Sequence, residues 1–79
     1  MPSFSKKILV PNQGTSEFQF DRIYTTDGIR YFVTVHRNGK YDHFNMHQRD
    51  GLWVIVNTEI LPDWILELEV ELANAILNH

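Results

Sequence analysis

The sequence contains no cysteine, and it has only four glycines and three prolines in 79 residues. Without cysteine the chain has no disulfide, no thiolate metal site and no cysteine nucleophile, which fits a reducing compartment. No apolar run approaches the roughly 18 residues that cross a bilayer. The run Ile8–Val10, after Lys6 and Lys7, is too short for the core of a signal peptide. We therefore expect a cytoplasmic protein that does not act in a membrane.

Positive charge is also scarce, because seven Lys and Arg residues face ten Asp and Glu residues and the formal net charge is −3. Duplex nucleic acid and anionic membranes attract basic surfaces, so we expect neither as a partner. Hydrophobic residues make up 43% of the chain and aromatic residues 13%, which predicts one folded domain. A domain of this length buries only about 60–65% of its unfolded surface. Self-association is an ordinary way to bury more.

Turn-forming residues surround the short run Lys6–Val10, with Pro2 before it and Pro11, Asn12 and Gly14 after it. We interpret residues 1–16 as a flexible N-terminal segment, with a short strand at Lys6–Val10 as the alternative. Residues 17–79 are predicted to form a single α+β domain.

Three strand-like runs follow, and each ends in a dipeptide suited to a tight hairpin loop: Asp27-Gly28, Asn38-Gly39 and Asp50-Gly51. The central residues of such loops take positive φ angles, which Asn, Asp and Gly tolerate. The pattern predicts an antiparallel meander of about four strands. The last strand, Leu52–Val56, is apolar on both faces, so its edge would aggregate unless the Lys6–Val10 run or a second copy of the chain covers it.

Counting outward from the loops predicts which residues lie opposite one another. The second loop places Val33 opposite Phe44, and the first places Phe20 opposite Val35. Because a slip of one residue would invert every side chain, the agreement of three loops on one apolar face supports the register. The predicted inner face contains Phe20, Tyr24, Tyr31, Val33, Val35, Phe44, Met46, Trp53 and Ile55.

Helical periodicity appears in the C-terminal segment, where Pro62 suits a first helical position and the pattern continues to Leu77. One apolar stripe is enough to cover the sheet, and a second stripe has no predicted neighbour within one chain. Glu69 projects between the stripes, and we predict that it pairs with Arg22 or lies at a helix–helix contact between two chains. The first stripe contains Leu61, Ile65, Leu68, Leu72, Ala75 and Ile76, and the second contains Leu66, Val70, Ala73 and Leu77.

Motifs for catalysis, cofactors and metals are not apparent. His43 and His47 would lie about 13 Å apart on one strand, which is too far to chelate one ion. A row of Asp21, Thr34 and His43 could supply a carboxylate, a hydroxyl and a base, but it would lie on an open sheet face. We therefore predict no catalytic residue, no cofactor and no metal.

Two further hypotheses concern ligands. A small-molecule or minor enzymatic site between helix and sheet would use Glu69, Arg22 and Tyr24. Single-stranded nucleic acid would use the outer sheet face around Phe32 and Arg30. The acidic composition disfavours nucleic acid, and one exposed ring is not a stacking platform.

The C-terminal half carries a set of packing residues at Gly51–Ile55, Pro62–Ile65, Leu68, Leu72, Ala75 and Ile76. This set resembles a group of short, uncharacterised bacterial proteins built as a β-meander followed by one C-terminal helix. The likeness covers roughly residues 29–79. It implies the fold alone, because no functional residue of that group can be transferred.

Surplus apolar surface is the feature that indicates a function. Besides the second helical stripe, the outer face is predicted to carry a contiguous apolar band, which is typical of a contact surface. We predict a non-enzymatic protein-interaction domain whose partner is protein, including a second copy of itself as a homo-oligomer. The predicted interaction surface contains Leu66, Glu69, Val70, Ala73 and Leu77 on the helix, and Ile23, Phe32, Val54 and Val56 on the outer face.

Overall fold

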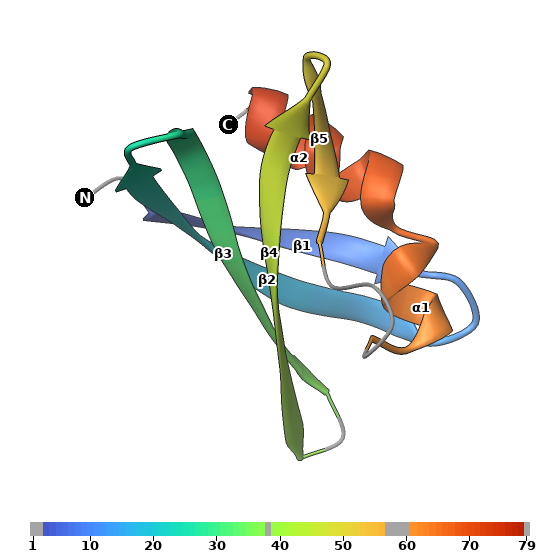
Figure 1. Ribbon diagram of the computed structural model, residues 1–79. Coiled ribbons are helices and arrows are strands. Elements are labelled where there is room, and N and C mark those ends of the chain that lie inside the picture. The colour runs from blue at the N-terminus through green and yellow to red at the C-terminus, as the bar shows by residue number, and fades with distance from the viewer. Residues whose placement is uncertain (1–2, 38, 57–60, 79) are drawn as a thin grey trace.

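The computed structural model describes residues 3–37, 39–56 and 61–78. Five antiparallel strands form one sheet in the order β1-β2-β3-β4-β5, and two helical segments follow them (Figure 1). The α+β meander is confirmed, with five strands instead of about four. The elements are β1 Ser3–Val10, β2 Gly14–Thr25, β3 Gly28–Arg37, β4 Lys40–Arg49, β5 Leu52–Ile55, α1 Asp63–Leu66 and α2 Glu69–Asn78.

The additional strand is β1, in the segment that the sequence left open between a flexible tail and a short strand. It pairs with β2 along all eight of its residues. Ile8 and Val10 are buried, and the ring of Phe4 stacks on Phe20 at a centroid distance of 4.6 Å. β1 therefore extends the sheet beside β2, and it does not cover the edge of β5.

The two hairpins β3–β4 and β4–β5 have the predicted register, including Val33 opposite Phe44. In the β4–β5 loop, Asp50 and Gly51 have φ angles of 54° and 82°, which this type of tight turn requires. Asn38, predicted for the β3–β4 loop, lies outside the described residues. The loop dipeptides therefore set the register of three of the five strands.

The β2–β3 hairpin closes one residue earlier than predicted. Thr25 lies opposite Gly28, so Phe20 pairs with Val33, two residues from its predicted partner. The Thr25 hydroxyl donates to the Gly28 carbonyl at 2.8 Å and accepts the N–H of Asp27 at 3.2 Å. These local bonds stabilise a turn centred before Gly28. A shift of two residues preserves which face each side chain occupies.

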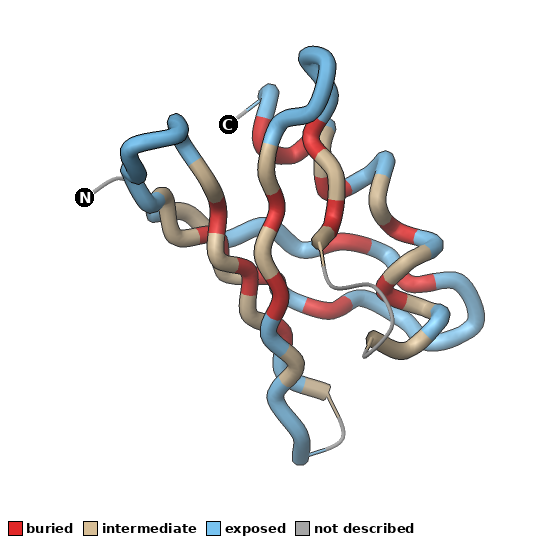
Figure 2. The backbone as a smooth tube through the Cα atoms, in the orientation of Figure 1, coloured by how far each residue is buried: buried red, intermediate tan, exposed pale blue. Residues whose placement is uncertain are grey.

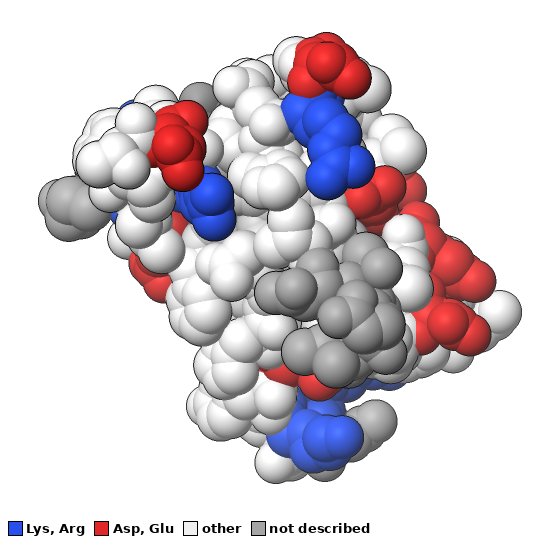
Figure 3. All heavy atoms as spheres, in the orientation of Figure 1, with Lys and Arg blue, Asp and Glu red and all other residues white. Residues whose placement is uncertain are grey.

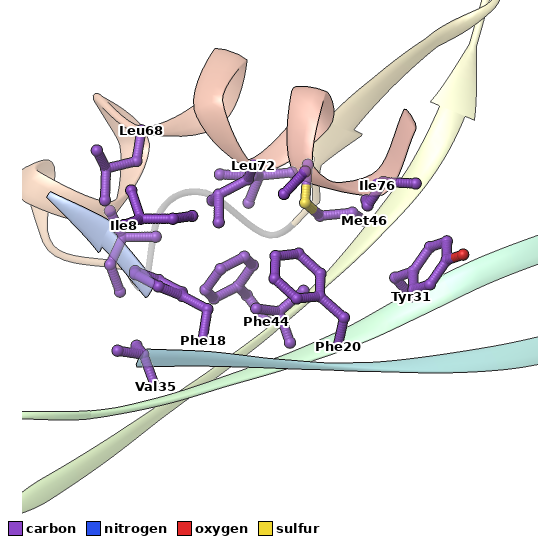
Figure 4. Close-up of a cluster of buried hydrophobic side chains, with 14 of the residues drawn as sticks. Ile8, Phe18, Phe20, Tyr31, Val35, Phe44, Met46, Leu68, Leu72 and Ile76 are labelled. Carbon is purple, nitrogen blue, oxygen red and sulfur yellow. The ribbon is translucent and has the colours of Figure 1, made fainter. Parts of the chain in front are cut away.

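The sheet curls into a half-barrel, with α2 against its inner face between β5 and β1 (Figure 1). Burial alternates along the strands (Figure 2), and Leu68, Leu72 and Ile76 point at the rings of the sheet (Figure 4). Tyr24, predicted inside, is 57% exposed near the end of its hairpin. The buried hydrophobic residues are Ile8, Val10, Phe18, Phe20, Tyr31, Val33, Val35, Phe44, Met46, Trp53, Ile55, Ile65, Leu68, Leu72, Ala75 and Ile76.

The helix predicted over Pro62–Leu77 is interrupted between α1 and α2. The N–H of Leu68 donates to the carbonyl of Ile65, three residues back, at 3.0 Å. The α-helical pattern resumes where the N–H of Leu72 donates to Leu68 at 2.9 Å. Ile65, Leu68 and Leu72 are all buried, so the interruption leaves the first apolar stripe against the sheet.

Arg37, at the end of β3, joins three parts of the fold. Its guanidinium donates to the Ser16 hydroxyl at 2.9 Å and to the Gln13 carbonyl at 3.1 Å. It also lies over the ring of Trp64, 5.4 Å from the centroid, in cation–π geometry. One side chain thus holds the β1–β2 turn and α1 together at the end of the half-barrel.

Candidate functional site

A groove separates the edge of β5 from α2. Its volume is about 220 Å³ and its wall is mostly apolar. Three large apolar side chains at this groove are exposed, because Leu52 is 68%, Val70 67% and Leu77 66% accessible. Single exposed apolar residues are ordinary, whereas a cluster is typical of a contact surface. The groove is lined by Gly51, Leu52, Trp53, Val54, Glu69, Val70, Ala73, Asn74 and Leu77.

The helix side of the groove is the second predicted stripe. Val70, Ala73 and Leu77 recur at intervals of three and four residues and so share one face of α2. Leu66, the fourth member, belongs to α1, is half-buried and does not line the groove. Leu52 was not singled out as a site residue from the sequence. Alternation along β5 was the signal that could have identified it as outward-facing.

Glu69 occupies part of the β5 edge. The N–H of Val56 donates to the carbonyl of Asn45 on β4, so the N–H of the neighbouring Ile55 points away from the sheet. That N–H donates to Glu69 Oε2 at 2.8 Å. The carboxylate therefore takes the place that a carbonyl of a sixth strand would take, which protects this part of the edge from further pairing.

Arg22 and Tyr24, which were expected near Glu69, make other contacts. Arg22 Nε donates to the Tyr31 hydroxyl at 3.0 Å, and one of its terminal nitrogens donates to Tyr24 at 3.4 Å. These bonds, first that to Tyr24 and then that to Tyr31, raise the pKa of Arg22 above its ordinary value. Arg22 shares a cross-strand row with Ile55 but lies three strands away, about 14 Å along the sheet. Glu69 therefore pairs with Ile55 instead of Arg22, and the three expected residues do not converge on one site.

Replacing Glu69 with alanine is expected to destabilise the protein by about 1–2 kcal/mol, because the Ile55 N–H loses a charged acceptor. Urea unfolding at equal protein concentration measures the loss. Hydrogen exchange at the Ile55 amide should quicken. Glu71→Ala is the matched control, since Glu71 is exposed on the same helix. Equal losses in the two variants would contradict this role of Glu69.

The apolar band predicted on the outer face is interrupted. Because β2 is shifted by two residues, Ile23 and Phe32 are not aligned in one cross-strand row as predicted. On β4, Asn45 and His47 lie between these residues and the valines of β5. The prediction of a contiguous band is therefore wrong, since polar side chains divide it. The valines are Val54 and Val56, both half-buried.

The predicted row of Asp21, Thr34 and His43 is broken by the same shift. Thr34 Oγ1 lies 3.2 Å from His43 Nδ1, but Gln19 takes the position opposite Thr34 on β2. Asp21 accepts hydrogen bonds from Ser3 at 2.8 Å and Gln19 at 3.2 Å, so its carboxylate does not orient the imidazole. Within the described part of the chain, no group of three or more His, Asp or Glu side chains is placed to hold a metal ion.

Among the described residues, no helix has both the length and the apolar character needed to cross a membrane. Comparison of the chain with protein-family models, curated proteins and solved structures finds no match. The resemblance to short bacterial proteins therefore stays a prediction.

Proposed function

We propose that this chain is a small, non-enzymatic, cytoplasmic protein-interaction domain that self-associates through the groove between β5 and α2. The observation that carries the proposal is the convergence of Leu52, Val70 and Leu77 on one groove, each with about two-thirds of its surface exposed. Apolar surface removed from water contributes about 25 cal/mol per Å² to an association before the entropic cost of binding is subtracted. The groove is therefore the place where a partner would gain most.

The side chains of α2 suit a second copy of the chain. The small Ala73 lies between the larger Val70 and Leu77 along the groove. If two such helices cross antiparallel about a two-fold axis, Ala73 of each copy lies at the centre and Val70 of one copy packs against Leu77 of the other. The same contact covers Leu52 at the rim. A domain with a small core benefits most from this additional burial.

The contact is made by side chains instead of by a continuous sheet. The outward N–H of Ile55 is already bonded to Glu69, so a second β5 strand would have no donor at that position. This distinguishes a limited oligomer from the open-ended edge pairing that leads to aggregation.

The oligomeric state tests the proposal. Sedimentation equilibrium over micromolar concentrations should give a mass above that of one chain, and Val70→Lys should restore the monomer because a charge would be buried in the contact. Leu9→Lys is the matched control, since Leu9 is 69% exposed and lies on the outer side of β1. Circular dichroism checks that both variants fold. A monomeric wild type, or equal effects of the two variants, would refute the proposal.

A further inference from the structure

A row of four rings crosses the outer face of the β3–β4 hairpin. Phe32 and His43 are stacked with 11° between their planes, His43 and Tyr41 with 14°, and Tyr41 and His36 with 24°. The centroid separations are 5.4, 6.3 and 4.4 Å in the same order. The two central rings, His43 and Tyr41, lie on β4 and the two outer rings, Phe32 and His36, lie on β3, so the register of the hairpin brings the four together.

Neighbouring rings in this row are nearly parallel, and they are also displaced sideways from one another. At centroid separations of 5.4 and 6.3 Å, near-parallel rings are offset, whereas Tyr41 and His36, at 4.4 Å, overlap more closely. Tyr41 is 63% exposed, and His36 and His43 are also exposed. The Thr34 hydroxyl contacts His43 Nδ1 at 3.2 Å, which limits rotation of that ring. The surface therefore offers a held series of flat groups to another flat molecule.

The charge around this row differs from that of the whole chain. Among the described outward-facing residues of β3, β4 and β5, two are arginines, Arg30 and Arg49, and none is acidic. Asp42 lies opposite Val35 and therefore belongs to the inner face of the sheet. Other acidic side chains gather on the side of α1 and α2 (Figure 3). Acidic residues adjoin this surface at its borders, since Asp21 on β2 lies opposite Phe32 and Asp27 lies in the β2–β3 loop near Arg30.

We propose that the outer face of the β3–β4 hairpin binds single-stranded nucleic acid, with bases stacked on Tyr41 and Phe32 and phosphates held by Arg30 and Arg49. Sheet surfaces that bind single strands combine aromatic side chains, on which bases stack, with cationic groups that follow the backbone. A duplex has no unstacked base to offer these rings. An acidic protein segment would use the arginines and leave the rings without a role. This function is additional to self-association, because the rings do not line the groove between β5 and α2.

Fluorescence anisotropy with a labelled single-stranded oligonucleotide of mixed sequence, at low salt, tests the proposal. Tyr41→Ala should weaken binding about tenfold, as expected when one base loses its stacking partner. Tyr24→Ala is the matched control, because Tyr24 is 57% exposed and lies off this face. Arg30→Gln and Arg49→Gln should each reduce the slope of log K against log salt by about 0.7.

Four results would overturn the proposal: no anisotropy change at low salt, an equal loss in Tyr24→Ala, tighter binding of the matched duplex, or displacement of the oligonucleotide by polyglutamate at equal charge concentration. The last result would identify the face as a site for acidic protein. Each result is separate from the sedimentation test of self-association, so one proposal can fail while the other stands.

Discussion

Phe20→Ala is expected to unfold most of the protein at 25 °C. Phe20 has no exposed surface, its ring stacks on Phe4 at 4.6 Å, and it meets Tyr31 edge-on at 6.4 Å. Truncating a buried phenylalanine to alanine costs about 3–5 kcal/mol. A single core in a chain of this length supplies little more than about 3–5 kcal/mol in total. One substitution is therefore comparable to the whole stability of the domain.

Near-UV circular dichroism and urea unfolding measure this effect, the first through loss of aromatic packing and the second through the midpoint. Phe32→Ala is the matched control, because Phe32 is half-buried on the outer face and its loss should be about 1 kcal/mol. If Phe20→Ala were no more destabilising than Phe32→Ala, the position of β1 beside β2, and with it the inner face of the sheet, would be wrong.

Leu72→Ala is expected to destabilise the protein by about 3–5 kcal/mol, the range seen for buried leucines that leave a cavity. Leu72 has no exposed surface and points from α2 toward the rings of the sheet (Figure 4). Because about 1 kcal/mol shifts the melting temperature of a small domain by roughly 4–8 °C, a loss of this size lowers it by more than about 10 °C. The helix would lose its central contact with the sheet.

Thermal denaturation followed by far-UV circular dichroism provides the measurement. Leu9→Ala is the comparison, since Leu9 is 69% exposed and a surface change of this kind stays within about 0.5 kcal/mol. The effect of Leu72→Ala should not depend on protein concentration once the groove variant Val70→Lys is used as background. Similar melting temperatures for the Leu72 and Leu9 variants would show that α2 does not cover the core.

The strand register shows how far local sequence signals reach. Asp50-Gly51 specified its hairpin because both residues adopt positive φ angles in the turn. The β2–β3 loop closed one residue early because the Thr25 hydroxyl bonds to Gly28 and Asp27. Most of the core was still predicted, since a two-residue shift keeps each side chain on its face, but Ile8, Val10 and Phe18 were missed and Tyr24 is exposed. The two rows predicted on the outer face, the apolar band and the row of Asp21, Thr34 and His43, were not predicted correctly. They depend on which residues of neighbouring strands lie opposite one another.

β1 illustrates a signal that is weak without its partner. Phe4, Ile8 and Val10 would face the same side of a strand, but Lys6 also falls on that side and interrupts the apolar pattern. Turn-forming residues surround the segment. The strand forms because β2 offers a complete edge and Phe20 offers a ring for Phe4. Contacts between residues this far apart in the chain are not encoded in the composition of either segment.

The sequence by itself determined the α+β class, the inner face of the sheet and the two stripes of the helical segment, because these follow from periodicities of 2 and 3.6 residues. Only the tertiary structure placed Val70, Ala73 and Leu77 against β5, bonded Glu69 to the Ile55 N–H, and brought four rings into one row. Those contacts depend on the closure of the half-barrel and on the offset between strands. Neither quantity has a period that can be read along the chain.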